Sequence, residues 1–347
     1  MQMIRPASIT VAVALALTLT GAGAEETTVR VGTARAISTG ATLIAIERGY
    51  FKEFGIKLEL EDINSSADVM AMIAQNQYQI VEGGISAGYF NAIQKDLPIT
   101  LVADRTSSPL GHNIMLRPDL KDQIKEIKDL KGKIIGTNGP GSVSTYEIGK
   151  VLEAGGLTLA DVEIKVIPFT QMGLALRNKA LDASLLIPPF TYQTRDQGLG
   201  LMFLDADTYV RPQPTAVAVN IINTDWAKKN PQLVKNYFVA YLRGVRDYCN
   251  AYHFGSTRKE IIDLLVKSGI ERRPELLNEY AWQSRDPNGR INVASVLDMQ
   301  SWYRKNKFTT ADFPAERLLD TSYVDYAVGK LGSFEPENRD SKLVGCR

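Results

Sequence analysis

The chain has 347 residues and nearly balanced charge, with 40 lysines and arginines against 39 acidic residues. This length exceeds what one hydrophobic core usually holds, so we expect two lobes. The lack of a basic excess argues against nucleic-acid binding. The two histidines, His112 and His253, and the two cysteines, Cys249 and Cys346, have no metal-ligand spacing, and we expect no metal and no cofactor.

The first 24 residues are typical of a secretory signal peptide. Arg5 precedes an apolar run, Ile9–Leu19, that is too short to span a membrane as a mature helix. Ala22-Gly23-Ala24 supplies the small residues that signal peptidase requires. We expect cleavage after Ala24 and export to the periplasm; the alternative is an uncleaved N-terminal anchor. No later run is long and apolar enough to cross a bilayer.

Strands alternate with helices from Thr28 onward, which predicts an α/β fold with mainly parallel sheets and right-handed crossovers. Asp104–Gly111 and Val210–Pro214 are rich in Pro, Gly or Ser and are predicted to cross between the lobes. Lobe 1 would then comprise residues 25–107 and 215–347, and lobe 2 residues 108–214. The expected strands are 28–32, 56–60, 79–81, 98–103, 134–135, 162–168 and 184–187, and the expected helices after the return to lobe 1 include 261–266, 276–282 and 293–302.

Residues 131–152 combine a short apolar strand, a turn of small residues and a helix with an apolar face. Ser142 or Ser144 can cap the first N–H groups of that helix. The amides left over, together with the positive end of the helix dipole, would point at whatever lies beyond the strand. The segment therefore indicates an anion-binding turn, with an ordinary strand-to-helix turn as the alternative.

Residues 32–60 resemble the opening of periplasmic solute-binding proteins of the nitrate, taurine, aliphatic-sulfonate and thiamine-pyrimidine type (SsuA/THI5-like, NMT1-like). Gly49-Tyr50-Phe51 followed by Gly55-Ile56 matches the turn into their second strand. Asp129–Lys133 and Leu181–Ala183 also resemble family segments, whereas Asn76–Gln79 departs from the family pattern. The resemblance implies a type II binding-protein fold that closes around a ligand. It also implies a monomeric component of an ABC importer, with a membrane permease as partner.

The family resemblance and the alternation of strands and helices together predict where the ligand lies. Ligands of open α/β sheets sit at the carboxyl ends of the strands, where three loops of small and hydroxyl residues occur here. Converging helix N-termini favour a small organic anion, a sulfonate or carboxylate, and Arg35 or Arg105 could pair with it. By resemblance, a Pro-Phe loop contacts an apolar tail. The expected binding residues are Ala36, Ser38, Thr39, Gly84, Ser86, Arg105, Gly139, Ser142, Val143, Ser144, Pro189 and Phe190.

Two other functions use the same fold. A thiamine-pyrimidine-synthase-like enzyme relies on a Cys-rich motif, which the widely separated Cys249 and Cys346 do not supply. A ligand-sensing receptor module would need a signalling partner, and the sequence shows no signalling domain after the binding lobes. We therefore expect no catalytic residues. In an exported protein the two cysteines can form a disulfide that holds the C-terminal tail, and two free thiols are the alternative.

Overall fold

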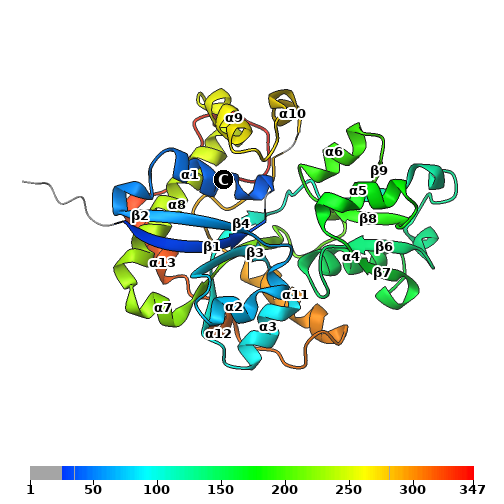
Figure 1. The fold of residues 1–347 in the computed structure, drawn as a ribbon, viewed down its shortest axis with the longest axis horizontal. Helices are drawn as coiled ribbons and strands as arrows, with labels where there is room; N and C mark the ends of the chain where they lie inside the picture. Colours follow the sequence, from blue (N-terminus) through cyan, green and yellow to red (C-terminus); the bar gives the residue numbers. More distant parts are fainter. Residues whose placement is uncertain (1–25, 35, 281) are drawn as a thin grey trace, which may run out of the picture.

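The computed structural model describes residues 26–34, 36–280 and 282–347. Within them the chain forms two lobes, each built on one five-stranded sheet that has helices on both faces (Figure 1). The two-lobed α/β fold is therefore confirmed. The predicted signal segment and Arg35 lie outside the described residues.

The first sheet has the strand order β2-β1-β3-β10-β4. β1 pairs in parallel with β2 and β3, whereas β10 runs antiparallel to both β3 and β4. All eight residues of β10 are buried, as a near-continuous apolar run in the middle of a sheet requires. The strands are β1 (Thr27–Thr33), β2 (Ile56–Asp62), β3 (Ile80–Gly84), β4 (Ile99–Ser107) and β10 (Ala216–Asn223).

The second sheet repeats this plan in the order β7-β6-β8-β5-β9. β6 pairs in parallel with β7 and β8, and β5 runs antiparallel to β8 and β9. In each sheet the fourth strand in the order, β10 or β5, follows a crossing from the other lobe and runs antiparallel, while the other four strands share one direction. Both sheets are therefore mixed but mainly parallel, as predicted. The strands are β5 (Asn113–Leu116), β6 (Ile134–Thr137), β7 (Glu163–Val166), β8 (Ala183–Leu186) and β9 (Leu201–Asp205).

The helices cover the sheets and fill the C-terminal third of the chain. None in the described part combines the length and apolar character needed to cross a membrane. They are α1 (Gly40–Glu47), α2 (Met70–Ala74), α3 (Ala87–Gln94), α4 (Val143–Ala154), α5 (Phe169–Arg177), α6 (Phe190–Asp196), α7 (Thr224–Lys229), α8 (Pro231–Tyr252), α9 (Arg258–Lys267), α10 (Pro274–Glu279), α11 (Val293–Lys305), α12 (Ala315–Leu318) and α13 (Ser322–Leu331).

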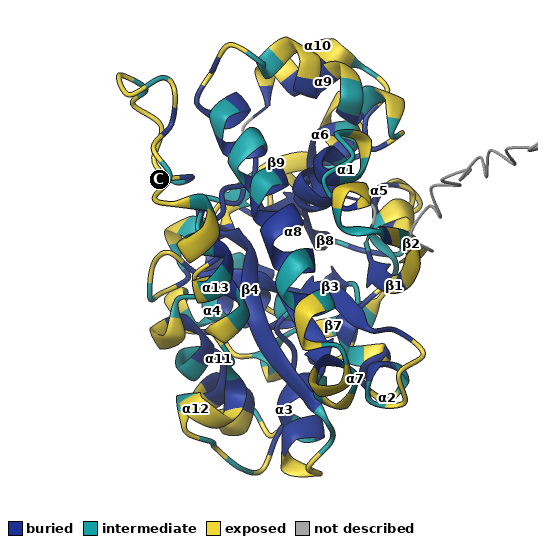
Figure 2. Cartoon of the chain, turned by 90° about the vertical axis from the view of Figure 1, so that its left-hand side faces the viewer, coloured by how far each residue is buried: buried dark blue, intermediate teal, exposed yellow. Residues whose placement is uncertain are grey.

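The largest core lies in the first lobe, where α8 and α1 pack on the sheet. Figure 2 shows β4 buried along its whole length and α8 largely buried beside it, with more exposed helices around them. The turn between α1 and β2 contains Gly49 and Gly55 with φ of +73° and +67°. Only glycine adopts this left-handed backbone without strain, which explains why the Gly49–Gly55 pattern is a recognisable motif.

The chain passes between the sheets at two places, from β4 to β5 and from β9 to β10. Residues 108–112 form the first crossing and residues 206–215 the second. Both crossings lie side by side, since the Ser108 amide donates to the Thr215 carbonyl at 3.1 Å. Two adjacent connecting segments of this kind allow one lobe to bend or twist relative to the other.

Candidate functional site

A cavity of about 70 Å³ lies between the lobes, at the carboxyl ends of β3 and β6. The first lobe contributes hydroxyl and amide groups, including Ser38, Ser65 and Ser66. The second contributes Asn138 and the start of α4. Arg105, at the end of β4, lines the cavity beside the first crossing. The cavity therefore occupies the place at which ligands bind in open α/β sheets.

Half of the predicted binding residues line this cavity, and the other half do not. Thr39 turns its hydroxyl to Arg105 and to the Ala34 carbonyl. Ser86 caps α3 and is fully buried, and Phe190 lines a neighbouring hollow. The lining residues are Ser38, Gly84, Arg105, Ser142, Val143 and Ser144; those outside the lining are Ala36, Thr39, Ser86, Gly139, Pro189 and Phe190.

The N-terminus of α4 faces the cavity. The Ser142 side chain accepts a hydrogen bond from the Thr145 amide, which is the expected N-cap arrangement. The amides of Val143 and Ser144 precede the first intrahelical hydrogen bonds, so they and the helix dipole are available to an anionic group. The Gly-rich turn thus presents a polar, positively polarised surface to the space between the lobes.

Arg105 is part of a buried ion pair with Glu82. Its Nε lies 3.4 Å from Glu82 Oε2, and its Nη2 donates to the hydroxyls of Thr39 at 2.6 Å and Thr33 at 3.0 Å. Glu82 also accepts from the Thr42 hydroxyl at 2.6 Å. Burial lowers the pKa of Arg105 and the Glu82 charge opposes that shift, so the guanidinium stays protonated. The carboxylate offsets much of the positive charge that Arg105 brings to the cavity.

His112 lines the same cavity and was not predicted as a site residue. Its Nδ1 lies 2.8 Å from Glu147 Oε1 on α4, and its Nε2 lies 2.8 Å from Gln283 Nε2 in the first lobe. Burial disfavours the imidazolium, but Glu147 outweighs this and raises the pKa of His112. The only sequence signal for His112 was that it directly follows the predicted first crossing, Asp104–Gly111. Glu82 had a clearer signal, because a carboxylate directly follows a buried strand and precedes Gly83-Gly84.

Direct contacts between the lobes border the cavity. The Ala87 amide donates to the Gly141 carbonyl at 2.9 Å, and Asn138 Nδ2 donates to the Asn64 carbonyl at 2.8 Å. A Cβ added at Gly84 would lie 2.5 Å from Val143 Cγ1, so the two lobes approach at van der Waals distance there. These contacts describe lobes that are closed on one another.

Further contacts hold the rim of the cleft. Tyr146 and Lys150 of α4 contact Asp298 of α11, with the Tyr146 hydroxyl 2.7 Å from Asp298 Oδ2. At the other end, the rings of Tyr192 and Tyr280 stack with centroids 3.6 Å apart. Each pair joins one lobe to the other, so the rim contributes to closure independently of the cavity.

A second hollow of about 370 Å³ adjoins the cavity and shares part of its wall, including Ile63, Asn64 and Phe169. Phe169 stacks on Phe190 with centroids 6.1 Å apart and an interplanar angle of 18°. Gly269 and Ile270 of the first lobe line the same space. The polar cavity therefore continues into an outer compartment that has an aromatic wall.

The sequence profile described as NMT1/THI5 like matches residues 38–251. The chain belongs to the NMT1/THI5-like family. This match spans the cavity lining from Ser38 to Ala218, which covers both lobes and both crossings. The resemblance predicted from the Gly49–Ile56, Asp129–Lys133 and Leu181–Ala183 segments is thereby confirmed.

Two curated proteins are similar to this NMT1/THI5-like chain. The riboflavin-binding protein RibY of Chloroflexus aurantiacus is 28% identical over 210 residues, 59% of this chain and 57% of RibY. The nitrate/nitrite binding protein NrtA of Synechocystis is 21% identical over 269 residues, 70% of this chain and 57% of NrtA. The chain spans a little over half the length of both relatives.

Solved structures with the same fold include the NrtA structure from Synechocystis, at a TM-score of 0.71 and 16% identity, with 93% of this chain and 92% of that chain covered. The alkanesulfonate-binding protein SsuA from Xanthomonas axonopodis pv. citri, bound to MOPS, has a TM-score of 0.70 and 14% identity, with 86% and 100% covered. At these low sequence identities, the structural similarity shows only that this NMT1/THI5-like chain has the same fold as the two solved structures.

Proposed function

We propose that this protein is the extracytoplasmic solute-binding component of an ABC importer and that it binds a small organic anion between its lobes. Lobe 1 would comprise residues 25–107 and 215–347 and lobe 2 residues 108–214, with hinges in the two crossings. The observation that carries the proposal is the cavity to which α4 presents its N-terminus from one lobe and Arg105 its guanidinium from the other.

The anionic head group would bind at α4. Arg105 shares its charge with Glu82, so it acts as a directional donor rather than as an unpaired cation. The amides of Val143 and Ser144, with the hydroxyls of Ser142 and Ser144, supply the remaining donors. Sulfonates and carboxylates suit this arrangement because their oxygens accept several hydrogen bonds at once.

The size of the cavity limits the head group. A cavity must offer about 10–15 Å³ to hold one water molecule, so 70 Å³ accommodates only a small group. This fits a sulfonate or carboxylate with a short carbon chain. A longer or flat apolar tail would extend into the outer compartment, against Phe169 and Phe190. The relation to RibY makes a flavin the second candidate, and a flavin would have to use both compartments.

An enzyme of the synthase type is supported less well. Both cysteines lie in the core of the first lobe and do not line the cavity. Within the described residues, no group of three His, Cys, Asp or Glu side chains could hold a metal ion. We propose instead a monomer that is exported after cleavage at Ala24 and that presents its closed form to the permease.

Calorimetry on a graded panel tests the proposed ligand. The panel contains methane- to hexanesulfonate, taurine, the matching carboxylates, nitrate and riboflavin. We expect micromolar or tighter binding of a sulfonate or carboxylate, together with a raised melting temperature, because a ligand that binds only the native state stabilises it. Tight binding of riboflavin alone would replace the anion by a flavin. No binding by any member would contradict the proposed function.

Two N-cap serines provide a matched control. Ser142→Ala and Ser86→Ala each remove a helix cap, which costs about 1 kcal/mol of stability. Only Ser142 lines the cavity, so Ser142→Ala should also weaken ligand binding, by about fivefold or more. Equal affinities of the two variants would remove the start of α4 from the site.

A further inference from the structure

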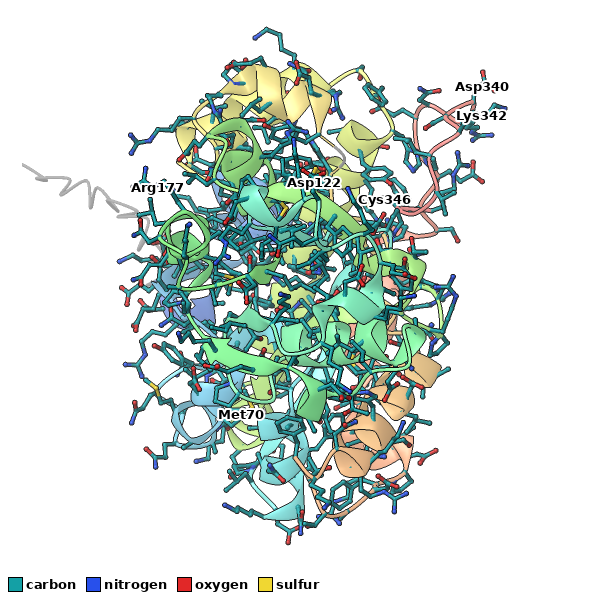
Figure 3. All side chains as sticks on the ribbon, turned by 90° about the vertical axis from the view of Figure 1, so that its right-hand side faces the viewer. Met70, Asp122, Arg177, Asp340, Lys342 and Cys346 are labelled. Carbon is teal, nitrogen blue, oxygen red and sulfur yellow. The ribbon has the colours of Figure 1, made fainter. Side chains whose placement is uncertain are left out.

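The C-terminal tail, residues 341–347, is anchored to the last two turns of α8. The Tyr252 hydroxyl donates to the Val344 carbonyl at 2.6 Å, and His253 Nε2 lies 3.1 Å from the Gly345 carbonyl. The Cys346 amide donates to Ser284 Oγ at 3.0 Å. Figure 3 shows Asp340 and Lys342 at the outer edge of the tail and Cys346 further inward. The side chain of Val344 is 76% exposed, whereas Cys346 is 1% exposed, so the tail buries its cysteine selectively.

Cys249 meets Cys346 at this anchor. It lies one turn before Tyr252 and His253 on α8 and is fully buried in the same hydrophobic cluster as Cys346. Both cysteines are free thiols in this structure, and burial together with the neighbouring Cys346 raises the pKa of Cys249. They are also the only cysteines in the sequence, so no other cysteine of the chain competes for either.

A buried cation lies beside the two sulfur atoms. The Arg285 guanidinium is 3.7 Å from the ring centroid of Tyr248, and its three nitrogens have no hydrogen-bond partner among the described residues. Burial raises the pKa of Cys249, and the positive charge of Arg285 opposes only part of that rise. The thiolate is the reactive species in disulfide exchange, so the raised pKa of the buried Cys249 means that the tail must lift before oxidation.

We propose that Cys249 and Cys346 form a disulfide after export, and that this bond fastens the tail against both hinge segments. The export step rests on the proposed function. One hollow of about 900 Å³ is lined by the tail, by Ser107 at the end of β4, by Ser108 and Pro109 of the first crossing, and by Arg211, Gln213 and Pro214 of the second. A covalently held tail therefore restrains the segments about which the lobes would move.

The reaction consumes one disulfide oxidant, a protein or small-molecule disulfide of the oxidising compartment. When the tail lifts from α8, the Cys346 thiolate attacks the oxidant and releases one thiol. The Cys249 thiolate then attacks the Cys346 sulfur of the mixed disulfide and releases the second thiol. The two cysteines lose two protons and two electrons, and the oxidant becomes two thiols.

The pairing is tested on protein exported by the expressing cell and purified without reductant. Alkylation under denaturing conditions should label no cysteine, and the intact mass should be two hydrogens lower than that of the reduced chain. After reduction, both cysteines should be labelled. Two labelled cysteines in unreduced protein that still binds its panel ligand would overturn the disulfide and leave the proposed function standing.

The fastening is tested by hydrogen exchange of the tail, with Cys249→Ser as a variant that keeps the size of the side chain. The loop closed by the bond is about 100 residues long, so reduction or Cys249→Ser should lower the melting temperature by roughly 5 °C or more. The Cys346 amide should exchange at least tenfold faster. A disulfide whose removal changes neither quantity would overturn the fastening.

Discussion

The approach of Gly84 to Val143 makes Gly84→Ala a direct probe of lobe closure. A Cβ at position 84 would lie 2.5 Å from Val143 Cγ1 and 3.1 Å from its Cβ, whereas carbon atoms in contact lie about 3.5–4.0 Å apart. Val143 is β-branched and has few alternative rotamers at the start of α4. The clash exists only when the lobes are closed, because the two residues belong to different lobes.

Overpacking of this kind costs about 1–3 kcal/mol, and each 1.4 kcal/mol is tenfold in affinity. Gly84→Ala should therefore raise the dissociation constant about 5- to 150-fold. Without ligand the lobes can separate and relieve the clash, so the melting temperature should change by less than about 2 °C. Calorimetry with the tightest panel ligand and a thermal scan without ligand measure both quantities.

Two further variants complete this experiment. Val143→Ala in the Gly84→Ala background removes the clashing methyl group and should restore most of the affinity. Gly32→Ala is the control, because its Cβ would meet only ordinary contacts of 3.4 Å within the first lobe. An unchanged dissociation constant for Gly84→Ala would refute the reasoning, since the bound state could not then have the closed arrangement.

Two other buried groups allow further tests. Arg105→Met leaves the Glu82 carboxylate buried without its cation and should cost about 3–5 kcal/mol of stability in denaturant unfolding. Adding Glu82→Gln should recover most of that stability. It should not recover the ligand affinity, which calorimetry measures. An unchanged affinity of the double variant would remove Arg105 from the site. Burial raises the pKa of Asp104 to about 7, above its unfolded value of 3.8, so its protonated form stabilises the fold below pH 4 and this contribution is lost as the pH rises through 7. Asp104→Asn should therefore gain up to about 4 kcal/mol over the wild type between pH 4 and 8 in urea unfolding, and a pH-independent difference would contradict the assignment.

Local patterns predicted most of the elements up to residue 187. The strands near Thr28, Ile56 and Ile134 and the helix after Ser142 have clear apolar periodicity and turn or cap residues at their ends, and the structure contains all four. β10 was missed, since its continuous apolar run lacks the alternation that marks a strand. α6, α12 and α13 were also missed, because they are short or begin without a side-chain cap.

Among the cavity residues, too, only those that a local sequence pattern marks could be predicted. Ser142 and Ser144 were predicted because a Gly-rich turn before a helix has a mechanism that can be read locally. Glu82 follows a recognisable strand, but its role depends on Arg105, which lies 23 residues away, and that of His112 depends on Glu147, 35 residues away. No local pattern encodes such a pair. Phe169 lines the cavity and stacks on Phe190, and this contact is likewise a property of the packed lobe.

Small-angle scattering with and without the tightest panel ligand tests the central claim, that the lobes close around a bound solute. A compact chain of this length has a radius of gyration near 20 Å. The ligand-bound protein should show about this value, and the free protein a measurably larger one, because only the closed form brings α4 and Arg105 to the same ligand. Equal radii with a ligand of proven affinity would contradict closure, and with it the account of how this cleft binds.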